Sequence, residues 1–352
     1  MSPAGRRFRR SPGRSGSTGI GCTSGVRGRD RGRLVRRRRA RRRDQEAGRD
    51  LSDTVEIRDP RLASVVGRTV AFEKLASGFQ FTEGPLWHAR DRYLLFSDMP
   101  GDHLRKWSAR DGVATFRKPC AQSNGLAWDR EGRLIVCEHA TSRLTRTEAN
   151  GDITVLASRH AGKELNSPND VVVKSDGAIY FSDPTYGRNK YYGNPRPSQL
   201  DFRGVYRVAP GGGSLSLLVD DFGQPNGLCF SRDEKQLYVN DTDRQHIRRF
   251  DVLEDGSLAN GRVWAETRGE GAGAPDGMKI DSAGNIYCCG PGGIHVFAPD
   301  AACLGVIRMP EYTANFCFGD DDLRSLYVTA STSLYRLRIG TTGTAQWRWN
   351  RR

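Results

Sequence analysis

The chain has 352 residues, with 55 Lys and Arg against 41 Asp and Glu, and its formal net charge of +14 suggests a nucleic-acid partner. Residues 1–50 carry 17 Arg and four acidic residues, a net charge of +13, whereas residues 51–352 carry 38 basic and 37 acidic residues, a net charge of +1. The charge therefore limits a nucleic-acid role to the first fifty residues. No apolar run approaches the ~20 residues of a membrane span, so we expect a soluble protein without a membrane partner.

The first element in chain order is an Arg-rich tail, predicted to be disordered over residues 1–60. It lacks the apolar core of a secretory signal, and three interpretations stay open. It is a disordered basic arm, a targeting segment, or the translation of a reading frame upstream of the natural start. We set it aside from fold reasoning and expect a folded body over residues 61–340 and a short C-terminal tail over residues 341–352.

Six similar segments follow one another along the body. Each begins with a residue that carries a side-chain oxygen, usually followed by Gly, then an apolar run, a charged turn and a β-rich run. They begin at Glu83, Asn124, Asn169, Asn226, Asp276 and Asn315. The starts are 41, 45, 57, 50 and 39 residues apart, and the longest step contains the insertion RNKYYGNPRPSQLDF at 188–202.

Four short β-runs fit into most of these units. In the first unit they are EGPLW at 83–87, RYLLFSD at 92–98, HLRKWSA at 103–109 and VATFRK at 113–118. Four antiparallel strands in each unit of about 40–50 residues predict an all-β, six-bladed β-propeller. The last unit has only TAQWRW at 344–349 as its fourth run, so TVAFEKL at 69–75 could close the ring instead. An open sandwich of many strands is the alternative.

The first residue of each unit is expected near one mouth of the central channel. Two carboxylates and four amides would then converge on the axis, a donor set that suits a hard divalent cation. Oxygen-only ligation favours Ca²⁺, with Mg²⁺ or Mn²⁺ next and Zn²⁺, which prefers Cys and His, as a further option. The alternative is turn chemistry, because Asn and Asp before Gly are good turn residues.

The second run of each unit returns to the same mouth. Its end offers side chains that we expect to form a polar rim, with His139 as a donor to a substrate hydroxyl; turn formation is the alternative for each. These residues are Asp98, Glu138, His139, Asp183, Asn240 and Asp241. The sequence lacks G-x-S-x-G, H-E-x-x-H and P-loop motifs, so a serine hydrolase or a nucleotide-binding enzyme is unsupported.

The eight cysteines form no C-x-x-C pair and mostly lie in apolar runs. We therefore expect buried, reduced thiols, which fits the cytoplasm.

The segments FTEGPLW, SPNDVVV, QPNGLCF and APDGMKI resemble the gluconolactonase family, also called the regucalcin or senescence marker protein family, over about residues 70–338. CEH at 137–139 and SDPTYG at 182–187 resemble its bacterial branch. The resemblance implies a six-bladed propeller with a divalent cation in the channel and hydrolysis of sugar lactones to aldonic acids.

The resemblance also implies roles for residues. Glu83, Asn226 and Asp276 match metal ligands, and Asn169 matches a position that contacts metal or substrate. Asp276 further matches the proton acceptor and donor. Predicted substrate-binding residues are Asn124, Glu138, His139 and Tyr186.

The predicted function is metal-dependent hydrolysis of a sugar lactone, by a monomer or a dimer. The alternatives are a non-catalytic propeller that binds carbohydrate or protein, a hydrolase of other esters at the same site, and nucleic-acid binding by residues 1–50.

Overall fold

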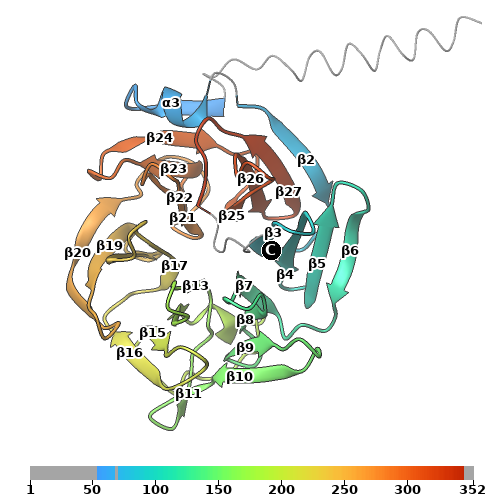
Figure 1. Cartoon of the computed structure of the whole chain (residues 1–352), viewed down its shortest axis with the longest axis vertical. Helices are drawn as coiled ribbons and strands as arrows, with labels where there is room; N and C mark the ends of the chain where they lie inside the picture. The colour runs from blue at the N-terminus through green and yellow to red at the C-terminus, as the bar shows by residue number, and fades with distance from the viewer. Residues whose placement is uncertain (1–53, 68–69, 345–352) are drawn as a thin grey trace, which may run out of the picture. The chain divides into compact units, whose positions relative to one another are not determined.

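The computed structural model describes residues 54–67 and 70–344. The predicted basic tail therefore lies almost wholly outside the described residues, as does most of the predicted C-terminal tail. Six sheets surround a central channel, and each is built from antiparallel strands (Figure 1). The six-bladed propeller predicted from the repeats is confirmed.

Each blade contributes one strand to each of four concentric positions. The innermost strands are β3 (Thr82–His88), β7 (Ser123–Trp128), β13 (Val171–Val173), β17 (Pro225–Phe230), β21 (Met278–Ile280) and β25 (Thr313–Gly319). The second strands are β4 (Tyr93–Asp98), β8 (Leu134–Glu138), β14 (Ile179–Asp183), β18 (Gln236–Asp241), β22 (Ile286–Gly290) and β26 (Ser325–Ala330). The third strands are β5 (His103–Ser108), β9 (Arg143–Thr147), β15 (Gly204–Val208), β19 (His246–Val252), β23 (Gly293–Phe297) and β27 (Ser333–Arg338). The outermost strands are β6 (Gly112–Arg117), β10 (Ile153–Ala157), β16 (Leu215–Val219), β20 (Leu258–Glu266), β24 (Cys303–Arg308) and β2 (Phe72–Ser77).

The outermost strand of the last blade comes from the beginning of the body. Strand β2 pairs antiparallel with β27, from Phe72 opposite Leu337 to Ser77 opposite Ser333. The ring is thus closed by residues far apart in the sequence, as expected for the run at 69–75 and not for an open sandwich. All but the first residue of the competing run at 344–349 lie outside the described residues.

The fifth blade carries an addition that the repeats do not predict. Strand β1 (Val55–Ile57) pairs with β24 as a fifth strand, and helix α3 (Leu62–Val66) buries three apolar side chains beside it. Both lie in or next to the segment set aside as a tail, so its last residues contribute to the propeller. The remaining short elements are the ribbon β11 (Arg159–His160) and β12 (Lys163–Glu164), and the 3-10 turn η1 (Tyr186–Arg188).

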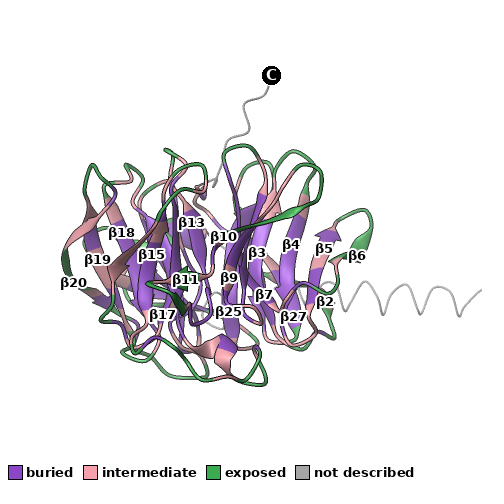
Figure 2. Cartoon of the chain, turned by 90° about the horizontal axis from the view of Figure 1, so that it is seen from below, coloured by how far each residue is buried: buried purple, intermediate pink, exposed green. Residues whose placement is uncertain are grey.

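The core consists of six clusters of buried apolar side chains, and each cluster is shared by two neighbouring blades. Alternation along the second strands explains this arrangement. In β14, Ile179 and Phe181 pack toward the second blade, whereas Tyr180 packs toward the fourth. The inner strands are therefore buried on both faces, while the outermost strand β6 is largely exposed (Figure 2). Within the described ranges, no helix is long and apolar enough to cross a bilayer.

Candidate active site

A cavity of about 120 Å³ lies where the innermost strands begin. Five of the six predicted axial residues line it: Glu83, Asn124, Asn169, Asn226 and Asp276. The sixth, Asn315, lies behind them and donates from Nδ2 to Glu83 Oε2 over 3.0 Å. The structure therefore brings the predicted ligand set together at one end of the channel.

Glycine next to the axial residue makes this convergence sterically feasible. A Cβ on Gly84 would lie 2.0 Å from the carbonyl oxygen of Asn124, and one on Gly227 would lie 2.2 Å from that of Asp276. The backbones of neighbouring blades thus touch where only glycine fits. The axial residues are not in turns: the pairing registers of β3, β7 and β17 shift around the axial residue, as bulges near functional sites do. Turn chemistry does not explain the Asn-Gly pattern.

Two carboxylates dominate the electrostatics of the cavity. Glu83 and Asp276 are only 3% and 8% exposed. Burial, together with the negative charge of Asp170, raises the pKa of Glu83 to about 7. Burial and the charges of Glu83 and Asp170 raise the pKa of Asp276 well above its usual value. Burial first, and then mutual repulsion, disfavour the charged forms of both carboxyl groups in this cavity.

The positive charge of Lys279 acts on Glu83 from the side of the channel away from the cavity. Its ammonium donates to Asn315 Oδ1 over 3.3 Å and lies 3.7 Å from Asp170 Oδ2. Asn315 relays this contact to Glu83. Lys279 therefore holds Asn315 and Asp170 in place beneath the cavity, and its ammonium group is occupied by these two contacts.

Two amide oxygens in the cavity have no partner. Asn226 Nδ2 donates to Thr242 Oγ1 over 3.2 Å, and that hydroxyl donates to the carbonyl of Pro275 over 2.6 Å. This contact turns Asn226 Oδ1 away from Thr242, and the oxygen is buried without a hydrogen bond, as is Asn124 Oδ1. Buried acceptors without donors are costly. Beside two mutually repelling carboxylates, they form a donor set that fits a hard cation.

Clusters of three or more His, Cys, Asp and Glu suited to a metal do not occur in the part of the chain that the structure describes. The candidate set here differs in kind, because amide oxygens supply half of the predicted ligands. Such a mixed set suits Ca²⁺ better than Zn²⁺.

The predicted polar rim is largely wrong. Glu138 does not line the cavity; it accepts hydrogen bonds from Arg143, Thr145 and Thr141 on the other face of its strand. Asp98, Asp183 and Asp241 do not line the cavity either.

Each of these three aspartates accepts backbone N–H bonds from the loop that leads into its blade. Asp183, for example, accepts from Asn166 and Ser167 over 2.8 and 2.7 Å. The equivalent donors are Gln80 and Phe81 for Asp98, and Gly223 and Gln224 for Asp241. Asn240 donates to the carbonyl of Asp276. These side chains hold loops and do not line the cavity, which agrees with the turn-forming alternative.

His139 and Tyr186 do line the cavity, as predicted. His139 is fully buried; its Nε2 lies 3.1 Å from Asn124 Nδ2 and its Nδ1 lies 3.1 Å from the carbonyl oxygen of Tyr192. Burial lowers the pKa of His139 to about 4, so the ring is neutral near pH 7. Tyr186 Oη is buried without a hydrogen-bond partner, and burial raises the pKa of this phenol, which keeps it a donor.

The sequence did not identify five further lining residues: Phe81, Met99, Tyr192, Thr242 and Tyr312. Four of them lie directly before a first strand or directly after a second strand, so the repeat pattern held a signal for them. Tyr192 comes from the insertion and had none. These residues make the wall aromatic: the Phe81 ring lies 5.1 Å from that of Tyr192 and 6.1 Å from that of Tyr312.

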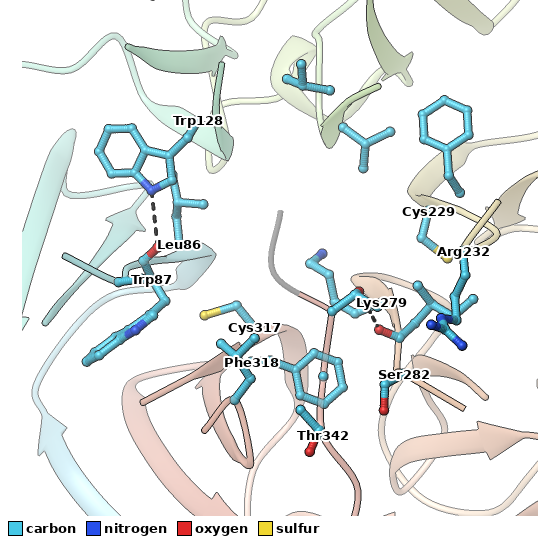
Figure 3. Close-up of a pocket in the computed structure, with 18 of the residues that line it drawn as sticks. Leu86, Trp87, Trp128, Cys229, Arg232, Lys279, Ser282, Cys317, Phe318 and Thr342 are labelled. Atoms are coloured by element: carbon cyan, nitrogen blue, oxygen red, sulfur yellow. Dashed lines mark hydrogen bonds between the residues drawn. The ribbon is translucent and has the colours of Figure 1, made fainter. Parts of the chain in front are cut away.

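A larger cavity of about 410 Å³ lies where the same strands end, at the opposite mouth of the channel (Figure 3). We call this end the wide mouth, and the end that holds the 120 Å³ cavity the narrow mouth. Its wall includes Trp128, Cys229, Phe230 and Phe318. Trp128 Nε1 donates to the carbonyl of Trp87 over 3.2 Å, which occupies its only donor. Apolar side chains outnumber polar ones here, and among the residues that the structure describes Glu234 is the single carboxylate at this mouth, so the Glu83–Asp276 pair has no counterpart in them.

Comparison with known proteins gives a consistent pattern. A family model described as the SMP-30/Gluconolactonase/LRE-like region matches residues 81–332. The chain is 34% identical over 307 residues to a gluconolactonase of Zymomonas mobilis, covering 81% of this chain and 85% of that protein. It is 26% identical over 291 residues to a pentonolactonase of Haloferax volcanii, covering 76% and 93%. A solved gluconolactonase of Xanthomonas campestris superposes with a TM-score of 0.75 at 35% identity, covering 81% and 94%.

Proposed function

Because the chain belongs to the SMP-30/gluconolactonase/LRE-like family, we propose that it hydrolyses a sugar lactone to the aldonic acid at the narrow mouth of its channel. One observation carries the proposal: two buried carboxylates and two unpartnered amide oxygens face one cavity. Lactonases named for different sugars are among the relatives, so the sugar itself is left open.

The proposed cofactor is one divalent cation, held by Glu83, Asn169, Asn226 and Asp276. A cation there would compensate the charge that raises both carboxyl pKa values and would satisfy the free oxygen of Asn226. Oxygen-only ligation favours Ca²⁺ over Mg²⁺, Mn²⁺ or Zn²⁺. When bound, such an ion supplies Lewis acidity toward the lactone carbonyl and stabilises developing negative charge.

Asp276 is the proposed general base and acid. Its carboxylate accepts a proton from the water that attacks the lactone carbonyl carbon. As the bond from that carbon to the ring oxygen breaks, Asp276 returns the proton to the leaving oxygen, so that one water is added overall. One carboxylate oxygen must stay free of the cation for this role, because ligation lowers its proton affinity.

The remaining wall orients the substrate and limits access of water. Tyr186 offers a neutral hydroxyl without a partner, suited to donate to a substrate oxygen. Phe81, Tyr192 and Tyr312 give apolar faces against which a ring can pack.

The same aromatic wall favours a second candidate, hydrolysis of a less polar lactone or ester at the same carboxylates. A non-catalytic propeller stays the alternative of a different class. The cytoplasmic location is likewise a proposal, supported by seven free thiols in the described part. The oligomeric state, a monomer or a dimer, stays a prediction.

The test is a panel of sugar lactones and apolar lactones, assayed on the full chain with and without chelator. We expect turnover of a sugar lactone that chelation abolishes and Ca²⁺ restores. Asp276→Asn should lower kcat by about 10²–10³ with the cation still bound, whereas Asp111→Asn, which changes an exposed carboxylate, should not. Full activity of Asp276→Asn would refute its role, and an inert protein under every condition would favour the binding propeller.

A further inference from the structure

The insertion between β14 and β15 forms part of the wall of the candidate site. Its Tyr192 lines the cavity and packs edge-on against Phe81, while Tyr191 donates from its hydroxyl to the carbonyl of Gln80 over 3.2 Å. Directly before the insertion, Gly187 lies so close to His139 that a Cβ would be 2.8 Å from the Cβ of that histidine, and within the insertion the carbonyl oxygen of Tyr192 lies 3.1 Å from His139 Nδ1. The insertion and His139 are therefore in direct contact.

The hydrogen bonds of His139 can be assigned from the chemistry of its partners. The carbonyl of Tyr192 can only accept, so Nδ1 must carry the proton and donate to it. The buried ring is neutral, which leaves Nε2 as a bare acceptor. Nε2 therefore accepts from the Nδ2 group of Asn124, and this contact turns Asn124 Oδ1 toward the cavity, where it is buried without a partner.

We infer that His139 is a positioning residue that joins the inserted loop to Asn124 and fixes Asn124 Oδ1 as a hydrogen-bond acceptor in the cavity. Both ring nitrogens are engaged, so His139 neither donates to a substrate hydroxyl nor returns a proton to the ring oxygen. The oxygen that it presents suits the hydroxyl of a polyol lactone or the cation. This functional consequence rests on the proposed lactonase activity.

Two variants separate the two contacts of His139. In His139→Gln the side-chain carbonyl can still accept from Asn124 at the position of Nε2, whereas the bond to Tyr192 is lost. In His139→Asn the shorter amide can still donate to Tyr192 at the position of Nδ1, whereas the contact with Asn124 is lost.

We expect His139→Gln to keep kcat/KM for the preferred lactone within about threefold. His139→Asn should lower it about tenfold or more, through a higher KM or a weaker Ca²⁺ affinity measured by calorimetry on the chelated protein. The pH profile of His139→Gln should match that of the unmodified protein. Equal losses in both variants, the reverse ranking, or loss of an ionisation from the profile would overturn the inference.

A measurement without catalysis tests the same assignment. Nitrogen NMR of the histidine rings in the chelated protein should show His139 as the Nδ1–H tautomer from pH 6 to 8, with His139→Gln identifying its signal. An Nε2–H tautomer, or titration between pH 6 and 7, would overturn the inference. If the tautomer is as expected and no lactone is turned over, the proposed function fails while the positioning role stands.

Discussion

The two mouths of the channel are built from opposite ends of the same six strands. Where the strands begin, the side chains carry carboxylate and amide oxygens around a cavity of about 120 Å³. Where they end, mostly apolar side chains and a single carboxylate among the described residues, that of Glu234, line a cavity of about 410 Å³. The larger cavity is therefore the weaker candidate, because chemistry needs convergent polar groups more than space.

Lys279 marks the boundary between the two mouths. It lines the larger cavity, but its ammonium is directed to Asp170 and Asn315 beneath the smaller one. The positive charge of Lys279 thus acts on the carboxylate pair from the side of the wide mouth, whereas the side that faces the small cavity is left for a ligand. The propeller is therefore polarised along its axis.

Removing one carboxylate at the narrow mouth should have the largest effect. Glu83→Gln removes a charge from the proposed cation site and should lower kcat/KM for a lactone by about 10³ or more. The measurement is steady-state kinetics with saturating Ca²⁺, combined with calorimetry of Ca²⁺ binding.

Glu234→Gln is the matched control, because it makes the same change at the wide mouth. It should leave kcat/KM within twofold. Comparable losses in both variants would mean that the two mouths do not differ in function.

Removing the ammonium group of Lys279, which lies between the two mouths, should lower the free energy of unfolding. Lys279→Met leaves the Asp170 carboxylate buried without its ion pair, and breaking such a pair costs about 3–5 kcal/mol in the free energy of unfolding. Urea denaturation measures this loss. Arg110→Met, which removes an exposed ion pair, should leave the denaturation midpoint unchanged, and an equally small shift for Lys279→Met would show that the lysine is not needed there.

The carboxylate pair should also make the chelated protein pH-sensitive. The pKa of Glu83 is about 7 in the folded state against a reference of 4.5, so the folded state keeps a proton that the unfolded chain has released. The free energy of unfolding should therefore fall by about 3 kcal/mol as the pH rises from 4.5 to 7, and Asp276 should add to this loss.

Thermal and urea unfolding across this pH range check the slope. Saturating Ca²⁺ should flatten it, and Glu83→Gln should reduce it. A slope of the same size in Glu83→Gln would place its origin elsewhere, for instance at Asp183, whose pKa burial also raises to about 7.

The smallest effect is expected at the rim of the wide mouth. Arg232→Ala removes an exposed cation there and should change kcat/KM less than twofold. A larger change in the lactone assay would mean that the wide mouth takes part in catalysis or substrate access.

The repeats predicted the number of blades and the closing strand because each blade repeats one pattern of burial. They did not predict β1 and α3, which occur once. The Arg-rich sequence before β1 placed that strand in the predicted tail, and α3 follows directly after the predicted tail ends, yet Val55, Leu62 and Val66 are buried and pack with the last two blades.

The axial residues of the site were predictable because position in the repeat fixes position in space. The residues of the polar rim were not predictable, because the sequence does not show which groups donate hydrogen bonds to a given carboxylate. Asp98, Asp183 and Asp241 end second strands as predicted, but backbone N–H groups of their own loops take up their oxygens. Within the aromatic wall, Tyr192 was not predictable because it comes from the insertion, which lies outside the repeat.

The shared clusters and the closing strand have a mechanical consequence. Every blade is anchored on both sides, and the blade that would otherwise expose an open end is held by β2. Because an early strand completes the last blade, no blade forms a free end of the ring, so a single cut in an exposed outer loop, such as that between β5 and β6, should leave a nicked protein that stays assembled and melts as one unit.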